Sequence, residues 1–278
     1  MNKFTYTSVL SIAGFDGSGG AGIQSDIKTV SALGCYSTTV LTALPVQNTQ
    51  GVRNIHSIST AAVAEQLDAI LEDIPPQAIK IGMVHTARLV ETIVDKLSSY
   101  PDIPVVFDPV MVSTSGHHLI EQDTIQAIKA LLLPIADMIT PNMDEAAILA
   151  EMDVNDLNDM TIAGERIFPM TPGGILLKGG HQKGRTLTSL YMDVDKEVYA
   201  FEMNKIDTKN THGSGCTLSS AIASFIARGE SKLDAVTLAQ NFIEQAIFHG
   251  RDVVIGKGHG PLNHFFNPTK LIKNELVG

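Results

Sequence analysis

The chain has 278 residues, of which 44 % are hydrophobic, so it is long and apolar enough to bury one large core. Its formal net charge of −10 disfavours nucleic acid and anionic membrane surfaces as partners, because both are negatively charged. The only cysteines, Cys35 and Cys216, are far apart in the sequence, and neither a signal peptide nor a membrane span is evident. We therefore expect a cytoplasmic protein without disulfides.

Apolar runs with the length of buried strands alternate with segments in which apolar residues recur at helical spacing. In chain order we predict a strand over 9–13, a helix over 23–33, a strand over 38–43, a helix over 61–71, a strand over 79–84, a helix over 87–97, a strand over 105–112, a helix over 124–132, a strand over 138–140, a helix over 144–151, a strand over 175–177 and a last helix over 231–248.

This alternation is typical of α/β proteins, in which helices cover both faces of a mostly parallel sheet and ligands bind at the carboxyl ends of the strands. Segments 188–193 and 198–204 predict a small antiparallel hairpin appended to that sheet. No linker, charge run or repeat divides the chain, so we expect a single domain over 1–278.

Two glycines, Gly213 and Gly215, come directly before an apolar helical pattern that begins at about Gly215 or Cys216. The free backbone N–H groups from Gly213 to Cys216 then converge on the loop before the helix. Such a site binds phosphate and lowers the pKa of a thiol in the first turn, here that of Cys216. An ordinary tight turn into an amphipathic helix is the alternative.

Two other glycine-rich segments fail the tests for known phosphate-binding motifs. Residues 17–22 have the spacing of a dinucleotide-binding loop, but no acidic residue between Asp26 and Glu65 is available to bind a ribose. Residues 179–186 nearly match a P-loop, but Arg185 stands in place of lysine and a strand follows instead of a helix. We therefore expect neither an NAD-binding nor a P-loop protein.

The segment 210–219 resembles the corresponding segment of the hydroxymethylpyrimidine and phosphomethylpyrimidine kinases of thiamine synthesis, and of the pyridoxal kinases similar to them. These enzymes belong to the ribokinase-like superfamily, in which a Gly-x-Gly-Asp sequence places an aspartate base beside the transferred phosphoryl group. Cys216 replaces that aspartate here. The resemblance extends from about Val9 to His264 and implies a ribokinase-like three-layer αβα sandwich.

The resemblance implies a set of catalytic residues. Cys216 is the expected base, and the backbone N–H groups of Gly213 and Gly215 are expected to stabilise charge on the transferred phosphoryl group. Lys178 ends an apolar strand before two glycines, where it is expected to act as a point charge against the ATP phosphates.

The resemblance also implies sites for ATP and Mg²⁺. Glu145 belongs to an Asn-x-x-Glu element whose carboxylate organises Mg²⁺ and its waters, and Asp108 at a strand end is expected in the same network. Asn142 alternatively only caps a helix, and Asp108 alternatively only ends a strand. The hairpin over 188–204 is expected near this nucleotide end. The ATP-binding residues implied are Lys178, Asn142, Thr211 and Ser214.

The acceptor side is implied by two further segments. Residues 13–26 resemble the N-terminal segment of these kinases, although Phe15 and Gly17 stand where serine is more usual. Gln47 matches a glutamine that pairs with the edge of the aminopyrimidine, since its amide offers both a donor and an acceptor. Met83 is expected on the face of the ring, with a place in the core as the alternative. The substrate-binding residues implied are Gln47, Gly14, Asp16, Met83 and His212.

The implied function is that of a dimeric kinase, dependent on ATP and Mg²⁺, that phosphorylates the CH₂OH group of hydroxymethylpyrimidine and then converts the monophosphate to the diphosphate. Pyridoxal kinase is the nearest alternative, with Cys216 adding to the aldehyde with help from His212. A cysteine-nucleophile hydrolase and a non-catalytic nucleotide sensor are the alternatives from other classes. Lys257, in a glycine-rich motif near the end of the resemblance, has no expected role.

Overall fold

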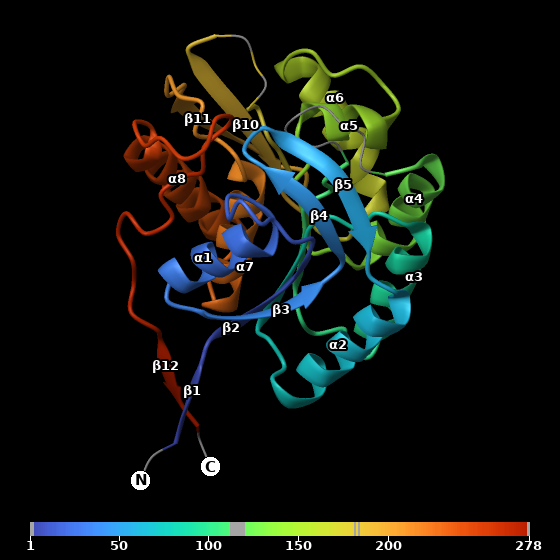
Figure 1. Ribbon diagram of the computed structural model, residues 1–278. Coiled ribbons are helices and arrows are strands. Elements are labelled where there is room, and N and C mark those ends of the chain that lie inside the picture. Colours follow the sequence, from blue (N-terminus) through green and yellow to red (C-terminus); the bar gives the residue numbers. More distant parts are fainter. Residues whose placement is uncertain (1–2, 112–119, 181, 183, 277–278) are drawn as a thin grey trace.

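The computed structural model describes residues 3–111, 120–180, 182 and 184–276. Its central sheet has eight strands in the order β11-β10-β9-β8-β7-β6-β2-β3 (Figure 1). The six strands from β9 to β3 are parallel to one another, β10 runs antiparallel to β9, and β11 runs antiparallel to β10. The bounds are β2 (Ser8–Ala13), β3 (Tyr36–Leu41), β6 (Ala78–Ile81), β7 (Val105–Phe107), β8 (Met138–Ile139), β9 (Gly174–Leu177), β10 (Thr186–Met192) and β11 (Val198–Asn204).

Helices cover both faces of the sheet, because consecutive residues of each strand point to opposite sides. Val106 packs into a cluster with α1, α7 and α8, whereas Phe107 packs into a cluster with α2, α3, α5 and α6. The expected three-layer αβα sandwich is therefore confirmed. The helices are α1 (Gly22–Ala32), α2 (Thr60–Asp73), α3 (Ala87–Leu97), α4 (Gln122–Ala127), α5 (Met143–Ala150), α6 (Leu157–Ile167), α7 (Ser214–Ala227) and α8 (Lys232–Gly250).

The predicted hairpin is present as β10 and β11, but it is not a separate appendage. β10 pairs with β9 through three residue pairs, so the hairpin continues the main sheet at one edge. The expected strand over 105–112 is shorter, since β7 ends at Phe107 and Val112 lies outside the described residues.

Several elements were missed by the sequence prediction. After Leu41 the chain leaves the main sheet, and β4 (Ala43–Asn48) pairs with β5 (Gly51–Ser57) in a separate two-stranded sheet. Most of β5 is exposed or half-buried and polar, so it lacks the alternation that marks a strand. Helix α6 was also missed, although its buried Met160, Ala163 and Ile167 recur at helical spacing.

The two ends of the described chain also pair with each other. β1 (Phe4–Tyr6) and β12 (Lys273–Glu275) form an antiparallel ribbon that extends away from the body of the molecule (Figure 1). None of the helices in the described part of the chain combines the length and the apolar composition needed to cross a bilayer.

Candidate active site

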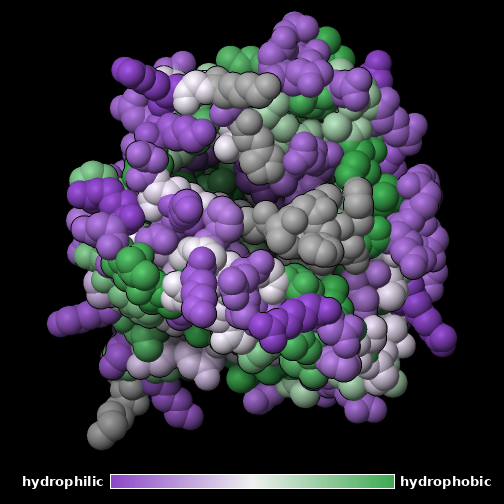
Figure 2. Space-filling view, turned by 45° about the horizontal axis from the view of Figure 1, so that its top comes forward, coloured by the Kyte–Doolittle hydropathy of each residue, from purple (hydrophilic) through white to green (hydrophobic). Residues whose placement is uncertain are grey.

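The carboxyl ends of the parallel strands open into a cavity of about 530 Å³. Gly14 follows β2, Asp108 follows β7 and Lys178 follows β9, and all three line the cavity. The hairpin β4–β5 forms another wall through Gln47 and Ile55. Figure 2 shows a hollow on this face of the molecule with hydrophilic side chains around it. The site thus lies where an α/β sheet of this kind is expected to bind ligands.

Of the residues predicted for the site, all but Asp16 line this cavity. They are Gly14, Gln47, Met83, Asp108, Asn142, Glu145, Lys178, Thr211, His212, Gly213, Ser214, Gly215 and Cys216. Leu187, Ser189 and Met203 line it too, so the hairpin β10–β11 reaches the site.

The glycine loop before α7 depends on Gly213. This residue has a φ of +81°, and a side-chain carbon there would collide with the Gly20 carbonyl oxygen, so the loop needs glycine for both reasons. The helix begins at Ser214, slightly earlier than expected. The Ser214 N–H donates to the Thr211 carbonyl oxygen at 3.1 Å, so it is engaged in the turn. The prediction of a free N–H at Ser214 was therefore wrong.

Gly215 faces the charged side of the cavity. A side-chain carbon at this position would lie 3.3 Å from the Lys178 ammonium and 3.5 Å from a carboxylate oxygen of Asp108. The absence of a side chain therefore leaves the first turn of α7 open to Lys178. An anion between this turn and the ammonium would meet positive charge from both sides.

Lys178 lies between two buried carboxylates. Its ammonium is 2.7 Å from Asp108 and 3.7 Å from Glu145. Asp108 also accepts hydrogen bonds from Thr140 at 3.0 Å and from Ser219 at 3.3 Å. Burial opposes ionisation of Asp108, but the charges of neighbouring lysines, above all Lys178, keep its pKa below the ordinary value.

Glu145 is the carboxylate of the pair that ionises less readily. Burial raises its pKa to about 7, the nearby Lys178 opposes that rise and the charge of Asp108 adds to it. The Glu145 carboxylate accepts the Asn142 N–H at 2.7 Å, and the Asn142 side chain accepts the Glu145 N–H at 2.9 Å. This reciprocal pair caps α5, so the alternative role of Asn142 as a helix cap is confirmed, while its expected role in ATP binding stays a prediction.

The donor set fits a hard cation that keeps much of its water. The described residues contain no cluster of three or more His, Cys, Asp or Glu side chains that would enclose a metal ion. Asp108 and Glu145 nevertheless bring two carboxylates to one lysine, and burial makes full ionisation of both unfavourable without further positive charge. Mg²⁺ is commonly held by one or two carboxylates together with substrate phosphates and water.

Cys216 lies in the first turn of α7, but its thiol does not have the lowered pKa that the sequence predicted. Burial raises the pKa to about 11, while the charge of Lys80 and the N–H of Gly22 oppose that rise. The loss of water around the sulfur therefore outweighs the favourable charge at the helix N-terminus.

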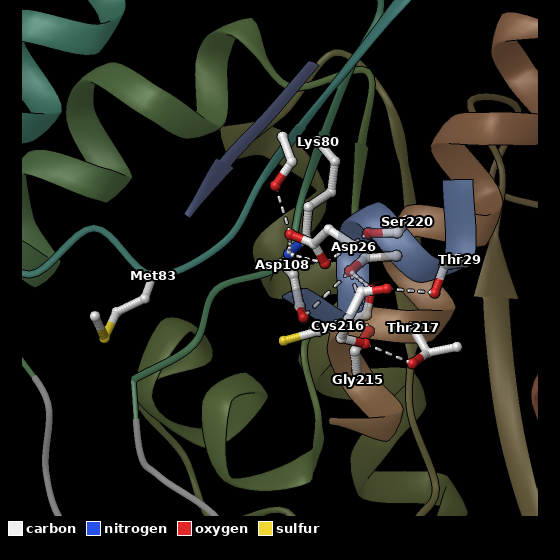
Figure 3. Close-up of polar contacts among 12 residues, drawn as sticks. Asp26, Thr29, Lys80, Met83, Asp108, Gly215, Cys216, Thr217 and Ser220 are labelled. Atoms are coloured by element: carbon white, nitrogen blue, oxygen red, sulfur yellow. Dashed lines mark hydrogen bonds and ion pairs between the residues drawn. The ribbon is translucent and has the colours of Figure 1, made fainter. Parts of the chain in front are cut away.

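The sequence analysis also missed two buried charges at the site. Lys80 on β6 and Asp26 on α1 are fully buried and paired at 2.8 Å. Figure 3 shows the contacts that Asp26 makes with Lys80 and Ser220, next to Cys216. The sequence could have indicated this pair, because Lys80 lies inside an apolar strand and a buried lysine requires a charged partner.

The acceptor wall is organised by Asp16, which is fully buried and lies behind the cavity instead of lining it. Burial opposes its ionisation, but hydrogen bonds, first that from His212 and then those from Ser18, Gln47 and Ala21, hold its pKa well below the ordinary value. Asp16 thus keeps His212, at 2.8 Å, and Gln47 in place.

Gly14 and Met83 form the adjacent part of the wall. A side-chain carbon at Gly14 would lie 2.7 Å from the terminal methyl group of Met83, so the glycine makes room for that side chain. Met83 is 9 % exposed and lines the cavity, so it is largely buried, and its place on the face of a bound ring stays a prediction.

The sequence matches the model of the phosphomethylpyrimidine kinase family over residues 16–263. It is 42 % identical over 257 residues to a hydroxymethylpyrimidine/phosphomethylpyrimidine kinase of Rhizobium meliloti, covering 92 % of this chain and 96 % of that protein. It is also 42 % identical over 261 residues to a thiamine biosynthesis bifunctional protein of Geobacter sulfurreducens, covering 94 % of this chain. The chain spans about half the length of that relative, 53 %.

Solved structures agree with this relationship. A phosphomethylpyrimidine kinase from Clostridium difficile superposes with a TM-score of 0.77 at 38 % identity, covering 86 % of this chain and 99 % of that one. A pyridoxal kinase from Staphylococcus aureus, in complex with AMP-PCP and pyridoxal, superposes with a TM-score of 0.86 at 29 % identity, covering 98 % of this chain and all of that one (100 %). Since the family match covers most of the chain, the protein belongs to the phosphomethylpyrimidine kinase family.

Proposed function

We propose that the protein transfers the γ-phosphoryl group of ATP to the CH₂OH group of hydroxymethylpyrimidine, and then phosphorylates the monophosphate to the diphosphate. The observation that carries this proposal is the composition of the cavity at the strand ends, in which Gln47 faces the same space as Lys178 and Cys216. The names of relatives similar over most of their length support the choice of acceptor.

The pyrimidine ring binds between the hairpin β4–β5 and the ends of the central strands. The Gln47 amide pairs with the ring nitrogen and amino group, because it offers one acceptor and two donors. Met83 packs against one face of the ring, and Gly14 lets the backbone approach it closely. Asp16 acts indirectly by holding Gln47 and His212.

The phosphates bind at the opposite side of the cavity. The N–H groups of Gly213 and Gly215 and the ammonium of Lys178 stabilise the negative charge of the transferred group. Asn142, Thr211 and Ser214 contact the nucleotide. Bound Mg²⁺ would be held by Asp108 and Glu145 and would supply positive charge to the phosphates.

Cys216 accepts the proton of the substrate hydroxyl as its oxygen forms the bond to phosphorus and ADP leaves. Only the thiolate can accept this proton, and the thiol pKa of about 11 keeps that form scarce near neutral pH. The rate of the first step should therefore rise about ten-fold per pH unit below that pKa if proton transfer limits it. The monophosphate is already ionised above its second pKa of about 6, so the second step needs no base.

Measuring the two phosphorylations separately in Cys216→Ala tests this role. The variant should slow monophosphate formation by about 10²–10⁴-fold and slow diphosphate formation much less. Cys216→Asp should recover part of the first activity, because a carboxylate is also a base. Equal losses in both steps would mean that Cys216 supports only the shape of the loop.

Acceptor identity is tested by coupled ADP release with hydroxymethylpyrimidine, its monophosphate and pyridoxal offered separately. Faster turnover of pyridoxal would favour the alternative kinase, and ATP binding without transfer to any acceptor would favour a nucleotide sensor. We also propose that the protein forms a homodimer. We place it in the cytoplasm, because Cys35 and Cys216 are both free thiols and thiols stay reduced in that compartment.

A further inference from the structure

His212 is held in place where the acceptor wall meets the glycine loop. Its Nε2 lies 2.8 Å from a carboxylate oxygen of Asp16, and its backbone N–H donates to the Gly260 carbonyl oxygen at 3.1 Å. A side-chain carbon at Gly20 would collide with the imidazole ring, so that glycine makes room for it. The ring therefore has a defined position in the residue directly before Gly213.

The protein uses one nitrogen of this ring. The ionised Asp16 carboxylate can only accept hydrogen bonds, so Nε2 of His212 carries the hydrogen and Nδ1 is left with a lone pair. Within the described residues, Nδ1 makes no hydrogen bond to the protein. The His212 side chain lines the cavity and keeps 13 % of its surface exposed. Beside an anion the ring can bind a proton, and both of its nitrogens then donate.

Asp16 connects His212 to the residue proposed to bind the edge of the pyrimidine. The same carboxylate is hydrogen-bonded by Gln47, and it accepts the backbone N–H groups of Gly20 at 3.2 Å and Ala21 at 2.7 Å. One fully buried group therefore sets the positions of Gln47 and His212 relative to each other. Along the cavity wall, His212 follows the ring-binding amide and precedes the loop for the transferred phosphoryl group.

The second acceptor carries a charge that the first one lacks, because the monophosphate is mostly a dianion above its second pKa of about 6. The basic side chains that line the cavity, among the described residues, are Lys80, Lys178 and His212. Lys80 donates to both carboxylate oxygens of Asp26, and Lys178 lies between two carboxylates on the nucleotide side. Of these three, His212 is the one joined to the acceptor wall through Asp16.

We propose that Nδ1 of His212 binds the phosphate of the phosphorylated acceptor, so that this residue selects the monophosphate as substrate of the second phosphorylation. With Nε2 held by Asp16, the protonated ring donates from Nδ1 to a phosphate oxygen in a charge-assisted hydrogen bond. Hydroxymethylpyrimidine has a neutral hydroxyl in place of that phosphate and does not need the charge. The inference rests on the proposed function, because it presupposes these two acceptors.

Calorimetric titration of the full chain without nucleotide, with hydroxymethylpyrimidine and its monophosphate in parallel, tests the inference. His212→Gln keeps an N–H that can donate to Asp16, but its side chain cannot become positively charged. This variant should weaken monophosphate binding about ten-fold to 150-fold, which is the range for a hydrogen bond to a charged group. Hydroxymethylpyrimidine binding should change by less than about two-fold, because no such bond is lost.

His56→Gln is the matched control, since His56 is an exposed histidine of β5 that does not line the cavity. It should leave both affinities unchanged. A similar weakening of both acceptors in His212→Gln would mean a purely structural role, and unchanged monophosphate binding would mean no role. Either result overturns the inference. If His212→Gln fails to fold, His212→Asn, which also lacks the charge, takes its place, and the same two results overturn the inference.

Turnover of the two acceptors separates this inference from the proposed function. If both hold, His212→Gln should raise the KM for the monophosphate by about the factor seen in binding and leave the KM for hydroxymethylpyrimidine nearly unchanged. An unchanged KM for the monophosphate would overturn the inference and leave the proposed function intact. A wild-type protein that phosphorylates neither acceptor would reject the proposed function, and the titrations would then still decide whether His212 binds the phosphate.

Discussion

Gln47 contributes an amide to the acceptor wall and is itself bonded to the buried Asp16. Gln47→Ala should leave polar atoms of the pyrimidine without partners, which costs about 1–3 kcal/mol, or about five-fold to 150-fold in affinity. We expect the KM for hydroxymethylpyrimidine to rise by such a factor while the KM for ATP changes little. Steady-state kinetics with each substrate varied in turn will measure both values.

Gln50→Ala is the matched control, since Gln50 is an exposed glutamine on the same hairpin. This variant should keep both KM values. A wild-type pyrimidine KM in Gln47→Ala would mean that the ring binds elsewhere in the cavity.

Glu145 and Lys178 lie 3.7 Å apart but have different expected roles toward the nucleotide. Glu145→Gln keeps an oxygen for the Asn142 N–H, so α5 retains its cap while a negative charge is lost. Its activity should be partly restored by raising Mg²⁺, because mass action offsets weaker cation binding. Lys178→Ala removes a charge that is expected to contact phosphate, and additional Mg²⁺ should not restore the activity of this variant.

Turnover of ATP as a function of Mg²⁺ concentration will distinguish these two variants. If their losses are identical and insensitive to Mg²⁺, the assignment of separate roles is wrong.

At the scale of elements, the hairpin β4–β5 is fastened to the rest of the site by the loop 256–260. The Thr49 hydroxyl accepts the N–H groups of Lys257 and Gly258 at 3.2 and 3.1 Å. The Thr49 carbonyl oxygen accepts the His259 N–H at 2.9 Å, and the next residue of the loop bonds to His212. The motif around Lys257, to which the sequence assigned no role, therefore joins the acceptor wall to the glycine loop through its backbone.

Thr49→Val should loosen this connection, because it replaces the hydroxyl by a methyl group and leaves two N–H groups without their acceptor. We expect the pyrimidine KM to rise several-fold, with a smaller change in kcat. Lys257→Ala keeps its N–H and should behave like the wild type. Thr92→Val, at a half-buried position of helix α3 that does not line the cavity, is the matched control for the substitution itself. Equal effects of Thr49→Val and Thr92→Val would contradict the role of the loop.

At the scale of the whole molecule, the apolar layers on the two faces share one sheet, so we propose that the chain unfolds as a single domain. Leu67 packs on one face and Ile222 on the other, and both are fully buried. Leu67→Ala and Ile222→Ala should each cost about 2–5 kcal/mol and lower the Tm by several degrees. Leu157→Ala, at a position that is 43 % exposed, should change it little.

Calorimetry and circular dichroism should show one coincident transition in each of these variants, because neither layer can lose its packing without exposing the shared strands. Two transitions that shift independently, one with Leu67→Ala and the other with Ile222→Ala, would show separate folding units.

The sequence by itself determined the class of fold and much of the site. Strand and helix periodicities are local, so the alternation that predicts a parallel sheet was visible without any knowledge of contacts. Gly213 and Gly215 before a helical pattern likewise predicted the loop, whose helix begins at Ser214. The order of motifs then suggested which side chains meet at the strand ends, and all but Asp16 line the cavity.

Only the tertiary structure decided how those side chains behave. Lys80 and Asp26 are 54 residues apart in sequence, and Thr49 is 208 residues from Lys257, so no local pattern records either contact. The sign of the Cys216 pKa shift also depends on assembly, because helix position favours the thiolate and burial by distant segments opposes it. The residues of the site could therefore be identified from local sequence patterns, whereas their pKa values and their contacts depend on packing between distant segments.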